Sequence, residues 1–329
     1  MKIAICDYKE PLNRDINREI TFFKQGLGED TEVVVYEHNG EEQSLIDAIH
    51  DADGILTSYL EFPASVINSA PKLKVISIEA TGYNFVDAEA ATKKGVAVTV
   101  IGEYCTQEVS EHVMALLLSV SRNLKHYQYQ IEQMHRFDYN DIHGMQRLEG
   151  QTMGIMGLGK IGRAVAQRAA GFGIKVLAYS PTCPPEAAAK AGALLVSEDE
   201  IYEKCDIISL NMRLTPENHG ILNARAFSKM KRKPIILNVS RGDLIVEEEL
   251  VKALDNGTVR GAGLDVLIRE THEETLSTPL AGRENVVITP HSAFYSDTSL
   301  YECQRIASMN VVHVLKGEKE KTFRMVNDV

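Results

Sequence analysis

The sequence predicts an α/β protein made of two doubly wound domains, each with a mainly parallel β-sheet. Short apolar runs alternate with helix-like segments along most of the chain, a pattern typical of parallel strands covered by helices. A glycine-rich turn near the middle begins a second series of such units. The length of 329 residues is sufficient for two hydrophobic cores.

The first half of the chain contains five strand-like runs, with helix-like segments such as Glu42 to Asp51 and Pro63 to Ala70 between them. The expected strands are Lys2 to Cys6, Glu32 to Tyr36, Asp53 to Thr57, Lys74 to Ile78 and Val96 to Val100. A hinge is expected at IGEYCT, followed by a helix with an apolar face from Gln107 to Leu124 and a more polar, aromatic stretch from Tyr127 to Leu148.

The second series has six expected strands and ends in a helix from Ser299 to Lys316, which we expect to return to the first domain. The strands are Thr152 to Met156, Lys175 to Tyr179, Ile207 to Asn211, Ile235 to Val239, Gly261 to Val266 and Val286 to Ile288.

The turn TMGIMGLGKIG carries Gly157, Gly159 and Gly162 between an apolar strand and an alanine-rich helix. In a Rossmann-type unit the first glycine makes the turn, the second admits a pyrophosphate, and the third lets helix and strand pack closely. The N–H groups and dipole at the helix start then face the phosphates. The three glycines alone would also fit an ordinary loop, but the flanking elements favour nucleotide binding.

Composition narrows the choice of partner. The formal charge of −11 disfavours binding to nucleic acid or to anionic membranes, and no apolar run approaches the ~20 residues of a membrane span. The five cysteines are scattered without a CxxC pair, so we expect neither a disulfide framework nor a metal site. A cytoplasmic location is the default expectation.

Polar residues follow three strands of the second series, where ligands bind in open α/β sheets. Arg241, Glu270 and His291 are respectively a candidate anion clamp, carboxylate and acid/base group, and Asp265 lies within the GLDV run. Taken singly, each has a structural alternative: a surface ion pair, a solvated loop, a loop histidine and a buried or capping aspartate. His112, His219 and His272 have no comparable pattern, and we expect them to be structural or surface residues.

The segments GIMGLGKIG, NVSRGDLIVEEEL, GAGLDVLIRE and NVVITPHSAFYS resemble the D-isomer-specific 2-hydroxyacid dehydrogenases. The similarity extends over nearly the whole chain. ATGYNFVD is similar to the family's substrate-carboxylate loop, and TQEVSEH to the start of the cofactor domain's first helix. PHSAFYS further resembles the branch related to the C-terminal-binding proteins.

The resemblance implies a role for each site residue. His291 would exchange a proton with the substrate oxygen, Glu270 would stabilise its imidazolium form, and Arg241 would hold the substrate carboxylate. The main-chain N–H groups of Thr81 and Gly82 would complete the carboxylate site. The residues expected to bind NAD or NADP are Gly157, Gly159, Lys160, Ile161, Gly162, Ser180, Asn211, Arg213, Val239 and Asp265.

Two departures from the family pattern concern the cofactor. The second strand ends in Ser180 where NAD enzymes usually carry an Asp or Glu, and Arg213 lies in NMRLT where the family often has His-x-Pro-Leu-Thr. Our hypothesis is that Ser180 and Arg213 accept a 2′-phosphate, which would make the protein tolerant of NADP or selective for it. In the alternative, Arg213 points to solvent.

These observations together predict a flavodoxin-like substrate-binding domain, residues 1–99 and 299–329, and a Rossmann-type dinucleotide domain, residues 100–298, with an interdomain cleft. We expect an NAD(P)-dependent oxidoreductase that interconverts a 2-oxo acid and a D-2-hydroxy acid, and a homodimer by family resemblance. The alternatives are a nucleotide-sensing scaffold protein and an NADPH-dependent glyoxylate or hydroxypyruvate reductase, whose small acids would fit a pocket narrowed by Phe294 and Tyr295.

Overall fold

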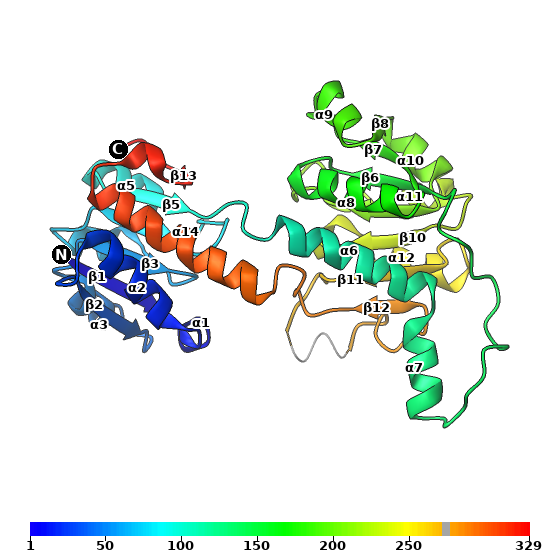
Figure 1. Ribbon diagram of the computed structural model, residues 1–329, viewed down its shortest axis with the longest axis horizontal. Coiled ribbons are helices and arrows are strands. Elements are labelled where there is room, and N and C mark those ends of the chain that lie inside the picture. The colour runs from blue at the N-terminus through cyan, green and yellow to red at the C-terminus, as the bar shows by residue number, and fades with distance from the viewer. Residues whose placement is uncertain (272–276) are drawn as a thin grey trace. The chain divides into compact units, whose positions relative to one another are not determined.

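The computed structural model describes residues 1–271 and 277–329, which form two compact units (Figure 1). The first unit comprises Met1–Tyr104 and Ser296–Val329, and the second comprises Cys105–Tyr295. These divisions fall within five residues of the expected boundaries after residues 99 and 298. Each unit is described by itself below.

The sheet of the first unit has the strand order β13-β5-β4-β3-β1-β2. Five strands are parallel, and their order is that of a flavodoxin-like sheet. The short strand β13 near the C-terminus pairs antiparallel to β5 and was not expected from the sequence. The strands are β1 (Lys2–Asp7), β2 (Glu32–Glu37), β3 (Gly54–Thr57), β4 (Val75–Ile78), β5 (Ala97–Val100) and β13 (Arg324–Met325).

Helices cover both faces of this sheet. The apolar side chains of α3, α4 and α5 pack on one face, and those of α2 and α14 pack on the other. The C-terminal helix α14 therefore belongs to the first unit, to which we expected it to return. The helices are α1 (Lys9–Leu12), α2 (Ile16–Leu27), α3 (Glu42–Ile49), α4 (Ala64–Ser69), α5 (Ala88–Lys94), α14 (Asp297–Leu315) and the 3₁₀ turn η2 (Lys319–Lys321).

The second unit has a seven-stranded parallel sheet in the order β12-β11-β10-β9-β6-β7-β8. From β6 onward this is the Rossmann order with a seventh strand added. The prediction of six strands was wrong because it missed β8, which has only three residues. The strands are β6 (Thr152–Met156), β7 (Lys175–Tyr179), β8 (Ala193–Leu195), β9 (Ile207–Leu210), β10 (Ile235–Asn238), β11 (Gly261–Leu264) and β12 (Val286–Ile288).

The helix expected from Gln107 to Leu124 is two helices. Asn123 has a φ of 50° and separates α6 from α7, because a left-handed residue cannot continue a right-handed helix. Apolar residues of α6, α8 and α9 pack on one face of the sheet, and those of α10, α11 and α12 pack on the other. The helices are α6 (Thr106–Ser121), α7 (Leu124–Glu132), α8 (Lys160–Gly171), α9 (Pro185–Lys190), α10 (Glu198–Lys204), α11 (Ala224–Lys229), the 3₁₀ turn η1 (Gly242–Leu244) and α12 (Glu247–Asp255).

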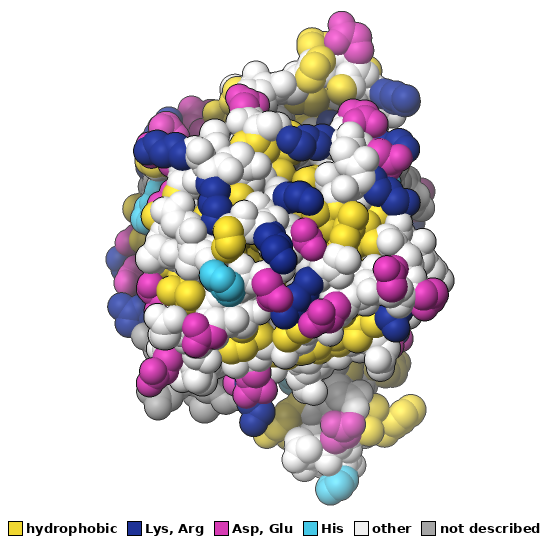
Figure 2. Space-filling model, turned by 90° about the vertical axis from the view of Figure 1, so that its left-hand side faces the viewer, with side chains coloured by type: hydrophobic (Ala, Val, Ile, Leu, Met, Phe, Trp, Pro, Cys, Tyr) yellow, Lys and Arg dark blue, Asp and Glu magenta, His cyan; other side chains and the backbone are white. Residues whose placement is uncertain are grey.

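Basic and acidic side chains are interspersed on the face of the molecule that Figure 2 shows. All five cysteines are free thiols. None of the helices in the described ranges is long and apolar enough to cross a membrane. Within the same ranges, no group of three or more His, Cys, Asp and Glu side chains is arranged to hold a metal ion.

Candidate active site

The glycine turn lies at the carboxyl edge of the second sheet, between β6 and α8. Gly157 has a φ of 95°, and a Cβ placed on it would lie 2.7 Å from the backbone oxygen of Asn211. Its N–H donates to the carbonyl oxygen of Tyr179 at the end of β7. Only glycine satisfies both the positive φ and the contact with the neighbouring backbone.

The other two glycines of the turn have opposite surroundings. A Cβ on Gly162 would lie 2.2 Å from the carbonyl oxygen of Gly157, so helix and turn are packed backbone to backbone. A Cβ on Gly159 would meet nothing within 4 Å. Lys160 is exposed and Ile161 is half-buried in the first turn of α8. The open face at Gly159, next to the N–H groups of a helix start, suits a bound diphosphate.

The end of strand β9 also borders the glycine turn. Asn211 follows β9, and its N–H donates to the carbonyl oxygen of Met156. Its side-chain amide donates to Ser209, whereas its Oδ1 is buried without a hydrogen-bond partner within the described ranges. An orphaned acceptor beside the turn is a feature that a bound ligand could satisfy. The residues present therefore fit a dinucleotide.

The two residues that depart from the family pattern are accessible. Ser180 follows β7 and is half-buried, and its carbonyl oxygen accepts a hydrogen bond from the N–H of Cys183. Arg213 is exposed, and its carbonyl oxygen accepts from Asn218. Val239 is half-buried in the turn after β10.

His291 and Glu270 form a hydrogen-bonded pair beyond the ends of β12 and β11. The distance between His291 Nδ1 and Glu270 Oε2 is 2.8 Å, and about two fifths of each side chain is exposed. Since an ionised carboxylate only accepts, Nδ1 carries the proton of this bond, and Nε2 is left to exchange a proton with a ligand. The fold thus brings together two residues that lie 21 positions apart in the chain.

The backbone of His291 is held in a left-handed conformation with a φ of 51°. Such a conformation costs about 1–3 kcal/mol in a residue other than glycine and needs surrounding contacts to maintain it. The N–H of His291 donates to the carbonyl oxygen of Asp265 at 2.8 Å. The N–H groups of Ser292 and Ala293 donate to the Asp265 carboxylate at 2.9 and 2.8 Å.

Asp265 is therefore a buried anchor for the loop that carries His291. It is 1% exposed, and its Oδ1 also accepts from the hydroxyl of Thr289 at 2.5 Å. The hydroxyl oxygen in turn lies 2.9 Å from His112 Nε2 on α6. The expected contact of Asp265 with the nicotinamide stays a prediction.

His112 and Thr289 were missed as site residues. They lie within the segments TQEVSEH and NVVITPHSAFYS, but neither segment indicates that they meet, because His112 precedes its partners by more than 150 residues. Of the other histidines, His219 is exposed near Asp243, and His272 lies outside the described residues.

Arg241 follows β10 and begins the 3₁₀ turn η1. Its carbonyl oxygen accepts from Asn238, and its guanidinium donates to the carbonyl oxygen of Ser240 at 2.6 Å. The guanidinium has no carboxylate partner within residues 1–271 and 277–329, and the side chain is exposed. A free guanidinium at the carboxyl edge is available to an anionic ligand.

A pocket of about 780 Å³ opens at this edge of the second unit. Its lining includes Asp265, Glu270 and His291, together with Thr289 and Lys125. The volume is in the range of small-molecule sites.

The loop expected to bind a carboxylate belongs to the first unit. It follows β4, and Thr81 and Gly82 are both exposed. The carbonyl oxygen of Ala80 accepts from the N–H of Ile101, which fixes the start of the loop. The exposed backbone leaves N–H groups accessible to a ligand.

A Rossmann sheet with a phosphate-binding turn and a histidine–carboxylate pair at one edge defines a dinucleotide-dependent oxidoreductase. Residues 114–293 match the family model of the D-isomer specific 2-hydroxyacid dehydrogenase NAD binding domain. The chain belongs to this family, whose members are NAD-dependent oxidoreductases acting on 2-hydroxy acids, and it is an enzyme of that class.

Three known proteins illustrate the relationship. The chain is 36% identical over 300 residues to a hydroxypyruvate reductase of Blautia hydrogenotrophica, covering 89% of this chain and 92% of the relative. It is 37% identical over 252 residues to a D-3-phosphoglycerate dehydrogenase of Mycobacterium tuberculosis, covering 76% of this chain but only 47% of the relative. The structure of a D-lactate dehydrogenase with NAD⁺ from Lactobacillus jensenii has a TM-score of 0.85 at 25% identity and covers both chains fully.

The chain thus spans about half the length of the phosphoglycerate dehydrogenases that it matches. The comparisons support NAD or NADP as cofactor and the two-domain α/β fold. They do not favour a nucleotide-sensing scaffold. The further resemblance to the C-terminal-binding proteins stays a prediction.

Proposed function

We propose that the protein reduces a small 2-oxo acid to the D-2-hydroxy acid, with His291 as the proton donor and Arg241 and the Thr81–Gly82 loop as the carboxylate-binding groups. The observation that carries the proposal is the 2.8 Å hydrogen bond between His291 Nδ1 and Glu270 at the edge that also holds the glycine turn. That pairing fits a histidine that must be oriented and protonated before it reacts.

The proposed roles follow from the charges. The pair with Glu270 stabilises the imidazolium form of His291, whose Nε2 then gives a proton to the carbonyl oxygen of the 2-oxo acid as that oxygen gains negative charge. The Arg241 guanidinium binds the substrate carboxylate and polarises the adjacent carbonyl. When bound, the reduced nicotinamide supplies the hydride that adds to the carbonyl carbon. His291 is left neutral and is reprotonated from solvent.

The test follows absorbance loss of NADH and of NADPH separately, against glyoxylate, hydroxypyruvate, pyruvate, 2-oxoisocaproate and phenylpyruvate. His291→Ala should lower kcat by about 10²–10⁴-fold while the dinucleotide still binds. Glu270→Gln keeps the hydrogen-bond geometry without the charge, so it should lower kcat less than His291→Ala does. Full turnover in His291→Ala would refute the assignment of the proton donor.

We also propose that Ser180 and Arg213 accept the 2′-phosphate of NADP. The absence of a carboxylate at the end of β7 removes the usual repulsion of a 2′-phosphate, and the exposed Arg213 supplies a cation after β9, which is separated from β7 by β6 alone. Arg213→Ala should raise the KM for NADPH about tenfold and leave the KM for NADH in place. Arg225→Ala, which removes an exposed arginine from α11, is the matched control. An equal effect of both variants, or none, would reject this role.

A homodimer formed through the arm of residues 124–148 completes the proposal. This arm leaves the sheet after α6 (Figure 1) and exposes large apolar side chains. Phe137 is 99% exposed, Tyr139 75%, and Tyr129 and Ile131 more than 50% each. Apolar exposure of this extent on one segment is typical of a surface that a second copy covers. Phe137→Asp should give monomers in light scattering, whereas Leu194→Asp, at another exposed apolar position, should not.

A further inference from the structure

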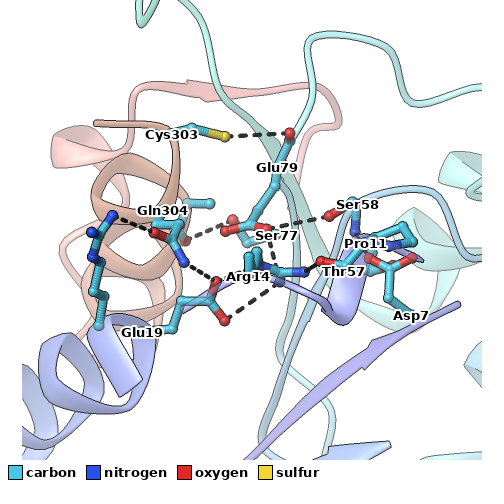
Figure 3. A network of polar contacts seen from close by, with 12 residues as sticks. Asp7, Pro11, Arg14, Glu19, Thr57, Ser58, Ser77, Glu79, Cys303 and Gln304 are labelled. Atoms are coloured by element: carbon cyan, nitrogen blue, oxygen red, sulfur yellow. Dashed lines mark hydrogen bonds and ion pairs between the residues drawn. The ribbon is translucent and has the colours of Figure 1, made fainter. Parts of the chain in front are cut away.

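A buried cluster of charged groups lies at the carboxyl edge of the first unit's sheet (Figure 3). Three carboxylates, those of Asp7, Glu19 and Glu79, surround the single guanidinium of Arg14. Asp7 and Glu19 are fully buried, and Glu79 is 8% exposed. With all groups ionised, the cluster would bury a net charge of −2, which is costly in a medium of low polarity.

Five of the six carboxylate oxygens have hydrogen-bond donors. Both oxygens of Glu19 accept from Arg14, and its Oε1 also accepts from Gln304 at 2.8 Å. The Asp7 oxygens accept from the backbone N–H groups that follow β1 and β3. Glu79 Oε2 forms an ion pair with Arg14 Nη2 at 2.8 Å and accepts a hydrogen bond from the hydroxyl of Ser58 at 3.2 Å.

The sixth oxygen, Oε1 of Glu79, is buried and has no partner within the described residues. A proton on this oxygen reduces the buried negative charge without breaking a hydrogen bond, whereas a proton on any of the other five oxygens would displace a donor. Burial raises the pKa of Glu79 to about 8, with a further contribution from the charge of Glu19, against the lowering effect of Arg14. Burial thus favours the protonated form of Glu79 near neutral pH.

Other groups facing Glu79 do not compete for this proton. The Tyr59 hydroxyl, after β3, has a pKa raised by burial and stays neutral. The thiol of Cys303 on α14 donates to the carbonyl oxygen of Glu79 rather than to its side chain. Gln304 on α14 and Ser58 carry no charge. The pKa that burial raises toward neutral pH is that of Glu79.

Glu79 is also joined directly to the loop that we assign to the substrate carboxylate. It follows β4, its N–H donates to the carbonyl oxygen of Thr57 at 2.8 Å, and the next residue, Ala80, begins the loop. Thr81 is two residues away, a distance of at most about 7 Å between Cα atoms. A charge that appears on Glu79 therefore arises on the residue directly before the loop whose N–H groups, those of Thr81 and Gly82, we assign to the anion.

We propose that Glu79 and Arg14 are positioning residues for the carboxylate-binding loop, and that the loop binds the substrate carboxylate well only while Glu79 carries a proton. This inference rests on the proposed role of Thr81 and Gly82. Loss of the proton changes the net charge of the cluster from −1 to −2, and the added negative charge opposes binding of a carboxylate at the loop. The affinity for the 2-oxo acid falls, whereas proton transfer from His291 in the bound complex is not altered by this charge.

The test compares wild type with Glu79→Gln, a neutral side chain of the same shape as the protonated acid. KM and kcat for the best 2-oxo acid are measured from pH 6.5 to 9 at saturating cofactor. We expect the ratio of the variant KM to the wild-type KM to fall toward about one tenth, with a midpoint near 8, while the kcat ratio stays level. Because both proteins contain His291, its own titration cancels in these ratios.

The matched control is Ser77→Ala, which removes a buried hydrogen bond from β4 to Ala307 without changing charge. It should keep the pH profile of wild type. Difference infrared spectra between pH 7 and 9 provide a readout independent of turnover, since one buried carboxylic acid band should disappear in wild type and be absent in Glu79→Gln.

A level KM ratio, a ratio displaced equally at every pH, or the lack of that infrared band would overturn the inference while leaving the proposed function intact. Lack of any turnover in wild type at pH 7 would overturn both.

Discussion

The Thr289 hydroxyl is a small group on which the geometry of His291 depends, and its removal gives a sharp test. Its proton goes to the Asp265 carboxylate, which can only accept, so its oxygen accepts from Nε2–H of His112. Thr289→Val preserves the shape of the side chain but breaks both bonds. Asp265 Oδ1 then keeps the backbone donor from Ser292 and has His112 Nε2 at 3.5 Å, while His112 loses its closest partner.

The magnitude follows from these two losses. Removing one partner of a buried polar group costs about 1–3 kcal/mol, more when the group left behind is charged. The His291 loop, held by the same carboxylate, stores about 1–3 kcal/mol in its left-handed backbone. We expect Thr289→Val to lower the free energy of unfolding by about 2 kcal/mol. As the loop relaxes, kcat should fall about 10- to 100-fold, because the proton donor is displaced from its reacting position.

The assay combines denaturant unfolding, steady-state kinetics and a direct measurement of dinucleotide affinity. Thr289→Ser is the matched control, since it keeps the hydroxyl and removes only a methyl group. It should retain most of the activity. The reasoning would be refuted if Thr289→Val kept wild-type kcat, or if Thr289→Ser lost as much as the valine variant.

Three further predictions concern the rest of the framework. Gly162→Ala would place a methyl group 2.2 Å from a backbone oxygen, so it should lower the free energy of unfolding by about 2–3 kcal/mol and weaken dinucleotide binding. The control is Gly171→Ala in the same helix, whose methyl group would meet nothing within 4 Å; it should be neutral or stabilising in thermal melts. The pKa of Glu79 is raised from 4.5 to about 8, so the stability due to its protonation is complete below pH 4.5 and is lost as the pH rises through 8. In thermal melts, the difference in unfolding free energy between wild type and Glu79→Gln should change by an amount on the order of 4–5 kcal/mol across that pH range. A difference that is the same at every pH would contradict this prediction. Asp206→Asn should lower the free energy of unfolding, measured with denaturant, by about 2–4 kcal/mol, because the nearly buried carboxylate accepts hydrogen bonds from Arg232 and from a backbone N–H group. An effect under about 0.5 kcal/mol would show that these bonds contribute little.

The strands of both sheets were largely predictable because their apolar runs are local and bounded by polar residues. Five of the six strands expected in the second unit agree with the prediction to within one residue at each end, and β11 ends two residues earlier than expected. The errors also have local causes. Ala193–Leu195 is too short to give an alternating pattern, and Asn123 interrupts a helix whose apolar spacing runs on past it.

The sequence by itself determined which residues stand at the ends of strands: the glycine turn at Gly157, Arg241 after β10, and His291 after β12. These positions follow from short-range patterns, which depend only on neighbouring residues. The tertiary structure decided which of them meet. The 2.8 Å pair of His291 with Glu270, the contact of His112 with Thr289, and the ion pair of Glu79 with Arg14 all join residues far apart in the chain. Such contacts depend on strand order and burial, so no local pattern in the sequence specifies them.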